Sequence, residues 1–187
     1  MAMSFTSLSR RVNKVASPAE LVVHPLAPVF DQKSRVLLLG TMPSPRSRQV
    51  GFHYGNPHNR FWHVLAALWN EETPTTVEAC HDLCLRRHVA LDDVLASCRI
   101  SGASDASIKD PVPNDLSRVL DFAPIERIFC TGSTAARLYR RLIEPSCGIA
   151  CVALPSTSPA NARMKLDDLI VAYAPVRAVA DGSLCGS

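Results

Sequence analysis

Short apolar segments that alternate with amphipathic segments limit most strongly how this chain can fold. The run at 35–40, RVLLLG, is continuously apolar and ends in glycine, which is typical of a strand buried on both faces of a parallel sheet. Similar runs at 89–95, 125–132 and 147–158 predict three more strands. Helical patterns separate these runs, so the sequence predicts an α/β/α sandwich with a central, mostly parallel four-stranded sheet.

Helical signals lie between and after the predicted strands. Apolar side chains from Phe61 to Trp69 recur at helical spacing and would share one buried face. Asn114 and Ser133 are typical N-cap residues and mark the start of two further helices. The predicted helices cover 59–70, 74–87, 114–122, 133–143 and 162–173.

The length of 187 residues favours one domain with short extensions. Residues 1–33 are polar and irregular and are interpreted as a leader that wraps a domain at 34–175, with 176–187 as a tail. No run of about 18 apolar residues exists, and no apolar segment precedes the basic residues near the N-terminus. We therefore expect a cytoplasmic protein with no membrane span. We also expect a monomer.

Neither the cysteine content nor the net charge identifies a ligand or a nucleic-acid partner. The seven cysteines include no CxxC pair, which favours reduced core thiols over disulfides or a zinc site, and we expect no metal and no cofactor. The formal net charge of +3 is too small to indicate a nucleic acid. Sixteen of the 20 basic residues are arginine, which suits phosphate recognition but also follows from a GC-rich genome.

The loop after the first predicted strand, 40–62, has unusual chemistry. Its glycines and prolines would turn the backbone sharply and point N–H groups into a pocket. Phe52 and Tyr54 offer flat faces for stacking on a base, and Asn56 and Asn59 offer amides that read a base edge or hold a water molecule. The loop contains no carboxylate, so it cannot by itself form a two-carboxylate hydrolase or a carboxylate metal site.

Structural roles compete with these functional ones. Phe52 and Tyr54 would serve equally well as loop anchors, and Asn56 or Asn59 as caps of the helix that starts near residue 59. Phe61 is expected in the helix core. The histidines of the loop have irregular spacing and are not expected to bind a metal: His53, His58 and His63.

The loop after the last predicted strand, LPSTSPANA (154–162), is rich in hydroxyl groups. Its serine and threonine side chains and backbone N–H groups suit contacts to DNA phosphates. A plain turn capped by Ser158 competes with that interpretation. No Walker A, GxGxxG or GxSxG motif occurs, which disfavours a phosphate loop, a Rossmann site and an α/β-hydrolase nucleophile.

Together the two loops resemble motifs of the uracil-DNA glycosylase superfamily, and within it most of all the hypoxanthine-DNA glycosylase family. The resemblance rests on G-T-M-P-S, Y-G-N-P-x-N-R-F-W and L-P-S-T-S-P-A-N-A, extends over about 34–175, and includes a similar middle segment at 91–110. It implies a four-stranded α/β/α fold that flips a damaged base out of DNA and hydrolyses its N-glycosidic bond.

The resemblance also implies site residues. Asn59 matches the asparagine associated with catalysis, and Tyr54 matches the aromatic residue that stacks on the flipped base. With Tyr54, the expected base pocket comprises Gly40, Thr41, Met42, Pro43, Ser44, Phe52 and Asn56. The expected DNA contacts are Arg46, Arg60, Ser156, Thr157, Ser158, Pro159, Ala160, Asn161 and Arg163.

The chain departs from its relatives at four places. Met42 stands where mismatch-specific uracil/thymine enzymes carry asparagine. Neither the segment at 43–44 nor that at 155–156 supplies the aspartate and histidine of classical uracil enzymes, so efficient uracil excision is not expected. After the third predicted strand, where relatives tend to have Asn-Gly, this chain reads Cys130-Thr131-Gly132, which would remove a pocket hydrogen bond.

With no general base in the motifs, catalysis is expected to rest on stabilising the departing base and positioning water. Asn59 would orient that water or hold the base, and backbone N–H groups at 41–44 would receive the developing charge. The expected partner is double- or single-stranded DNA that contains a damaged base. Hypoxanthine is the preferred candidate for that base, and uracil and xanthine are secondary candidates. Two alternatives stay open: a non-catalytic DNA-binding module with its arginines on phosphates, and a hydrolase of small nucleosides.

Overall fold

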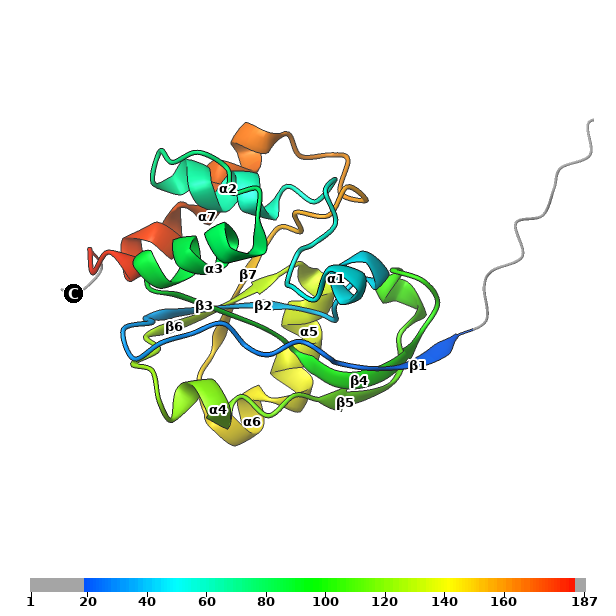
Figure 1. Ribbon diagram of the computed structural model, residues 1–187. Helices are drawn as coiled ribbons and strands as arrows, with labels where there is room; N and C mark the ends of the chain where they lie inside the picture. The colour runs from blue at the N-terminus through cyan, green and yellow to red at the C-terminus, as the bar shows by residue number, and fades with distance from the viewer. Residues whose placement is uncertain (1–18, 184–187) are drawn as a thin grey trace, which may run out of the picture.

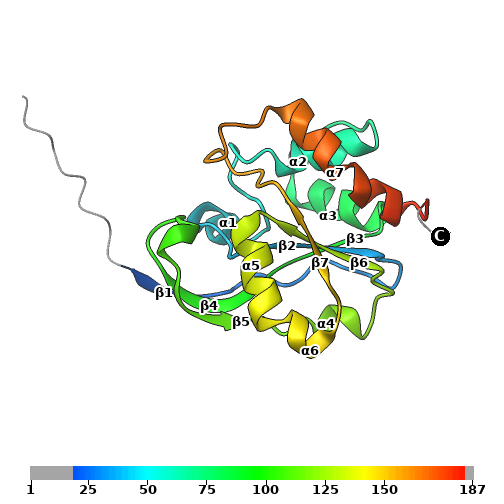
Figure 2. The ribbon, with the colours of Figure 1, turned by 180° about the vertical axis from the view of Figure 1, so that it is seen from behind.

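The computed structural model describes residues 19–183, so most of the expected leader and the last residues of the tail lie outside the described part (Figure 1). A four-stranded parallel sheet in the order β3-β2-β6-β7 forms the centre of the molecule (Figures 1 and 2). Its strands are β2 (Val36–Gly40), β3 (Val89–Asp93), β6 (Arg127–Thr131) and β7 (Cys151–Leu154). The predicted fold class is confirmed.

Helices cover both faces of this sheet, as Figures 1 and 2 show. One face carries α2 (Phe61–Leu68), α3 (Val77–Arg86) and α7 (Leu166–Ala180). The other carries α4 (Ser117–Leu120), α5 (Ser133–Leu142) and α6 (Glu144–Cys147). The continuous apolar run of β2 follows from this layering, because Leu38 packs with the first group of helices and Leu37 and Leu39 with the second.

A second sheet was not expected from the sequence. Strands β1 (Glu20–Val23), β4 (Leu95–Ile100) and β5 (Lys109–Pro113) form an antiparallel sheet in the order β1-β4-β5. The interpretation of 1–33 as an irregular leader is therefore wrong for β1. Four residues with one buried side chain give almost no periodic signal, and only pairing with β4 makes them a strand.

The last helix begins and ends later than the predicted 162–173. Helix α7 continues through Pro175 to Ala180, and Val176 and Val179 are buried in the core, so the tail cannot begin at 176. A proline removes one backbone donor and usually ends a helix, which explains the early stop in the prediction. Packing of α7 against α2 and β2 outweighs that local cost.

Two predicted caps are also wrong. Asn114 does not cap α4, because its Nδ2 donates to Asp92 Oδ1 at 2.9 Å and to the Asp93 carbonyl at 3.1 Å. Ser133 is the first helical residue of α5 rather than its cap, and Gly132 takes the cap position.

The first loop contains a short helix that the sequence analysis did not separate from it. Helix α1 (Pro45–Val50) begins with proline, and the Ser44 side chain accepts a hydrogen bond from the Ser47 N–H. Another short element, η1 (Asp105–Ser107), lies between β4 and β5. Within residues 19–183, no helix combines the length and apolar composition that a membrane crossing requires.

Candidate active site

The carboxyl ends of the central strands surround a pocket of about 590 Å³. Gly40 ends β2, Asp93 ends β3 and Thr131 ends β6, and all three line the pocket. The loop that follows β7 closes one side of it. Parallel α/β sheets bind ligands at this edge because the loops that leave adjacent strands converge there.

Both motif loops contribute to the pocket wall, although they are far apart in the sequence. From the first loop come Gly40, Thr41, Met42, Pro43, Ser44, Tyr54, Asn56 and Asn59, and from the second come Ser156, Thr157, Ser158, Pro159, Ala160, Asn161 and Arg163. The structure therefore brings most of the predicted site residues together, while their roles stay predictions.

Phe52, Arg46 and Cys130 do not line this pocket. Phe52 is buried and stacks on Trp62, with ring centroids 5.8 Å apart, so it anchors the loop. Arg46 is exposed on α1 and donates to Gln49. Cys130 is buried in the core, whereas the next residue of the same segment, Thr131, lines the pocket.

Arg60 has a different role from the predicted phosphate contact. Its guanidinium donates to the carbonyl oxygens of Thr157 at 3.4 Å, Ser158 at 3.0 Å and Asn161 at 2.9 Å, and also to that of Met164. Four of its five N–H donors are thus occupied by the backbone of the second loop. Arg60 positions that loop and has little hydrogen-bonding capacity left for DNA.

Tyr54 is held against the pocket by three constraints. Its ring stacks on buried Phe61, with centroids 3.6 Å apart and planes 6° apart. Its hydroxyl lies 2.9 Å from Thr131 Oγ1, and Thr131 donates to the Leu39 carbonyl, so the tyrosine is the donor of this pair. The backbone φ of 52° is in the left-handed region, which is rare for an aromatic residue. Phe61 thus covers the face of the Tyr54 ring that is turned toward the core.

The two asparagines of the first motif use their oxygens locally. Asn59 Oδ1 accepts from the Phe61 N–H at 3.0 Å, and Asn56 Oδ1 accepts from the His58 N–H at 3.0 Å. Arg60 takes the N-cap position of α2 and no side chain caps it, so neither asparagine is the predicted N-cap: Asn59 Oδ1 accepts from the first helical N–H, and the Asn56 bond lies in the preceding loop. Their Nδ2 groups have no partner among residues 19–183, and both side chains line the pocket, so each retains donors for a ligand.

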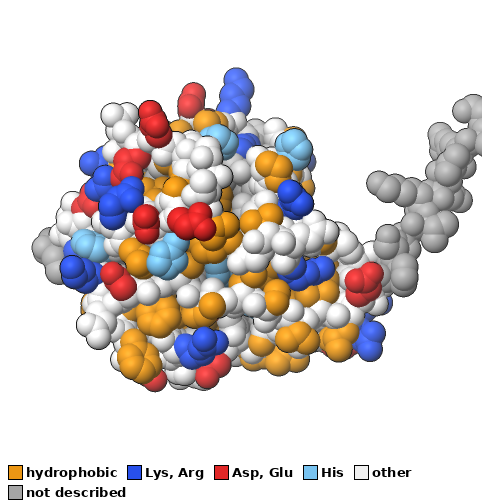
Figure 3. Space-filling view, in the orientation of Figure 1, with side chains coloured by type: hydrophobic (Ala, Val, Ile, Leu, Met, Phe, Trp, Pro, Cys, Tyr) orange, Lys and Arg blue, Asp and Glu red, His pale blue; other side chains and the backbone are white. Residues whose placement is uncertain are grey.

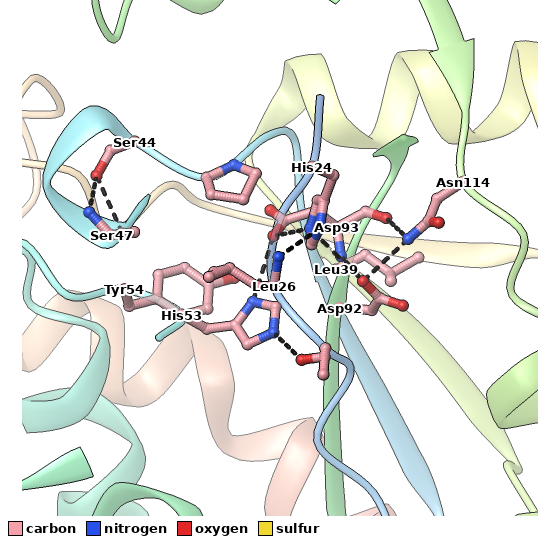
Figure 4. Close-up of polar contacts among 12 residues, drawn as sticks. His24, Leu26, Leu39, Ser44, Ser47, His53, Tyr54, Asp92, Asp93 and Asn114 are labelled. Atoms are coloured by element: carbon pink, nitrogen blue, oxygen red, sulfur yellow. Dashed lines mark hydrogen bonds and ion pairs between the residues drawn. The ribbon is translucent and has the colours of Figure 1, made fainter. Parts of the chain in front are cut away.

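The structure adds a buried carboxylate that the sequence analysis missed. Asp93 is 6% exposed, and its Oδ2 lies 3.0 Å from His24 Nε2 and 3.3 Å from His53 Nδ1 (Figure 4). The first loop lacks carboxylates, but the neighbouring strand β3 supplies one to the same pocket. The two motifs contain no general base, as expected, but a carboxylate from outside them lines the pocket. Two aspartates at the end of a predicted strand were the available signal.

The hydrogen bonds of this cluster define its charges. His53 Nε2 lies 3.1 Å from the Ala27 carbonyl and Nδ1 faces Asp93, so both ring nitrogens face acceptors and the imidazolium fits best. Burial lowers the pKa of His53, but interactions with Asp93 outweigh it and raise that pKa. Burial also opposes ionisation of Asp93, but hydrogen bonds from His24 and His53 lower its pKa to about 2.

Two further carboxyl groups surround Asp93. Asp92 Oδ1 accepts from the Asp93 N–H at 2.8 Å and from Asn114, and burial raises the pKa of Asp92 to about 6. Asp105 of η1 lines the pocket and accepts from Thr41 Oγ1 at 2.8 Å. Burial raises its pKa as well. The pocket thus contains one carboxyl group that favours ionisation, Asp93, and one that resists it, Asp105.

The basic surface expected around the pocket is less concentrated than the arginine content suggests. Arg163 lines the pocket rim and is exposed. On the face of the molecule in Figure 3, basic side chains are interspersed with acidic ones. Any attraction of this surface to a polyanion such as DNA must therefore come from individual side chains at the pocket rim, such as Arg163.

Known proteins are similar to this chain in sequence and in fold. The model of the uracil DNA glycosylase superfamily matches residues 27–175. Hypoxanthine DNA glycosylase of Methanosarcina acetivorans is 30% identical over 136 residues, which cover 72% of this chain and 85% of that protein. The Methanosarcina barkeri protein of the same name is 28% identical over 137 residues, or 73% of this chain and 86% of its own.

A solved structure agrees with these matches. The solution NMR structure of a Methanosarcina acetivorans protein assigned to the uracil DNA glycosylases superposes with a TM-score of 0.69 at 25% identity, covering 84% of this chain and 99% of that one. The family expected from the two motifs is confirmed. The chain belongs to the uracil DNA glycosylase superfamily, and its enzyme class is that of the DNA N-glycosylases.

Proposed function

We propose that this DNA N-glycosylase removes deaminated bases from DNA, with hypoxanthine as its preferred substrate. One observation carries the proposal: the pocket combines an aromatic ring backed by the core, Tyr54, with the free amide donor of Asn59 and the second motif loop. Two relatives at about this similarity are named hypoxanthine DNA glycosylase. Uracil and xanthine are secondary candidates.

The chemistry starts with a nucleotide turned out of the duplex. Opening a pair costs a few kcal/mol and is easiest for a mispaired base, which assists selection of a deaminated one. The base then stacks on the face of Tyr54 opposite Phe61. Asn59 orients the attacking water or donates to the base through its Nδ2.

Bond cleavage leaves negative charge on the departing base. Donors aimed at that charge lower the barrier, and the backbone N–H groups at 41–44 are candidates. Asp105 lines the same pocket, and burial raises its pKa, so this carboxyl group resists ionisation more than a free aspartate does. The motifs thus supply stabilisation of the leaving group rather than a strong nucleophile.

The exposed side chains at the rim of the pocket are the candidates for contacts with DNA. Ser156 and Ser158 are partly exposed and suit phosphate oxygens, and Arg163 is the basic side chain on the rim. Thr157 is 2% exposed, so its side chain supports the loop. We also propose that the protein acts as a monomer.

A base-release assay tests this function. A labelled duplex with one hypoxanthine, uracil or xanthine is incubated with excess protein, treated with alkali and analysed for strand cleavage. We expect cleavage at hypoxanthine, and a rate at least about 100-fold lower for Asn59→Ala. His81→Ala, on the exposed side of α3, is the matched control and should retain the wild-type rate.

The same assay separates the alternatives. Binding to these duplexes without release of any base would refute the enzyme and favour a binding module on the same fold. Cleavage of free deoxyinosine, with no activity on DNA, would instead indicate a nucleoside hydrolase. An unchanged rate in Asn59→Ala would remove Asn59 from the mechanism.

A further inference from the structure

One oxygen of the buried Asp93 carboxylate has no hydrogen-bond partner within residues 19–183. Its Oδ2 is occupied by His24 and His53, whereas no donor lies within hydrogen-bonding distance of Oδ1. The side chain is only 8% exposed, and Asp93 belongs to the pocket wall. Among the described residues no fully buried polar side-chain atom lacks a partner, so Oδ1 is open to the pocket. An acceptor held open at a pocket wall can pair with a donor on the ligand.

Asp93 Oδ1 lies near the hydroxyl group of Tyr54, on the same side of Gly40. A Cβ atom added to Gly40 would clash with Asp93 Oδ1 and would lie 3.4 Å from Tyr54 Oη. The bare backbone of Gly40, the carboxylate oxygen and the tyrosine hydroxyl therefore adjoin one another. Tyr54 donates its hydroxyl hydrogen to Thr131, so that hydrogen does not satisfy Oδ1. A base stacked on Tyr54 would bring its edge toward Oδ1.

Building on the proposed base-removal function, we propose that Asp93 Oδ1 accepts a hydrogen bond from the ring N–H of the flipped base. This contact would select bases in the lactam form. Deamination of adenine converts N1 from an acceptor into an N1–H donor, and deamination of cytosine does the same at N3. An ionised carboxylate only accepts hydrogen bonds, so it pairs with the deaminated base and opposes the lone pair of adenine N1 or cytosine N3.

The two histidines keep Asp93 in its accepting form. His24 Nδ1 accepts from the Leu26 N–H, which leaves a hydrogen on Nε2 for Asp93. His53 supplies a second donor, and its positive charge offsets the buried carboxylate. The lowered pKa of Asp93 agrees with this geometry. Asp93 is thus an acceptor whose orientation is defined before any base arrives.

The substitution Asp93→Asn tests the inference because the histidines also dictate how the amide lies. Two donors converge on the Oδ2 position, so the amide oxygen must occupy it and the NH₂ group must take the place of Oδ1. The substitution therefore replaces an acceptor with a donor at the same point. Asp92→Asn is the matched control, since Asp92 is an adjacent buried aspartate that does not line the pocket.

Binding is measured in the Asn59→Ala background, which slows base release, with duplexes that carry hypoxanthine or adenine opposite an abasic analogue. The abasic partner removes differences in pair opening. We expect the preference for hypoxanthine over adenine to fall at least tenfold in Asp93→Asn and to persist in Asp92→Asn. Circular dichroism and thermal melting establish that each variant is folded.

A ligand-side measurement covers the case in which Asp93→Asn does not fold. Protein with native Asp93 should bind hypoxanthine at least tenfold more tightly than either 1-methylhypoxanthine or unsubstituted purine, both of which lack the N1–H. Equal binding of all three bases would overturn the proposal.

Three further outcomes are distinguishable. An unchanged preference in folded Asp93→Asn overturns the base contact. Loss of base release with an unchanged binding preference places Asp93 in the chemical step and overturns it as well. Wild-type protein that releases no hypoxanthine, uracil or xanthine would instead refute the proposed function, whatever the result for Asp93→Asn.

Discussion

Replacing Arg60 with methionine separates two roles that one arginine can have in a DNA-binding protein. The sequence predicts Arg60 as a phosphate contact, whereas the structure shows its guanidinium donating to four carbonyl oxygens of the second loop. Methionine retains the apolar stem and removes all donors. The partner variant Arg163→Met removes an exposed rim arginine that makes no hydrogen bond within residues 19–183.

The four hydrogen bonds of Arg60 set the expected loss in the free energy of unfolding. A hydrogen bond inside a protein contributes about 0.5–1.5 kcal/mol net, and partial exposure of the loop reduces this, so four bonds amount to roughly 2–4 kcal/mol. We therefore expect Arg60→Met to lower the free energy of unfolding by about that amount, measured by urea denaturation. Arg163→Met should leave the stability unchanged within about 0.5 kcal/mol.

The salt dependence of DNA binding provides the decisive comparison. Each phosphate contact contributes about 0.9 to the slope of log affinity against log salt concentration. We expect Arg163→Met to reduce this slope by about that amount and Arg60→Met to weaken binding with the slope unchanged. A reduced slope together with unaltered stability in Arg60→Met would refute the assignment of Arg60 to the loop.

Three more substitutions test the pocket. Gly40→Ala should abolish base release in a folded protein, because its Cβ would clash with Asp93 Oδ1; wild-type release rates would contradict the geometry. Tyr54→Ala should cost about 1–3 kcal/mol of affinity for the flipped base through lost stacking, measured by duplex binding, whereas Tyr54→Phe should retain most of it. The raised pKa of His53 stabilises the fold fully below about pH 6.5, and this contribution disappears as pH rises through the raised value. The stability difference between wild type and His53→Gln should therefore shrink from pH 5.5 to pH 9 in urea denaturation, and a constant difference would argue against the imidazolium.

Local patterns were sufficient for the central architecture. The buried strands and the amphipathic helices each have a periodicity that depends only on neighbouring residues, and the order of these segments restricts the sheet to a parallel one. The two motif loops were located by the same reasoning, because they follow strands whose carboxyl ends share one edge. The C-terminal extent of helix α7 was not predicted, because core packing outweighs the local cost of Pro175. Strand β1 was not predicted, because it forms only through pairing with β4.

The sequence by itself determined the fold class, the family and the place of the pocket, since these depend on short-range periodicity and on contiguous motifs. Only the tertiary structure decided which side chains face the ligand. The guanidinium of Arg60 donates to backbone carbonyl groups of the second loop, and Asp93 is held ionised at the pocket wall by histidines remote in sequence, with His24 69 positions away. Charge and hydrogen-bonding capacity at such a site depend on burial and on partners brought together by folding, and no local pattern contains that information.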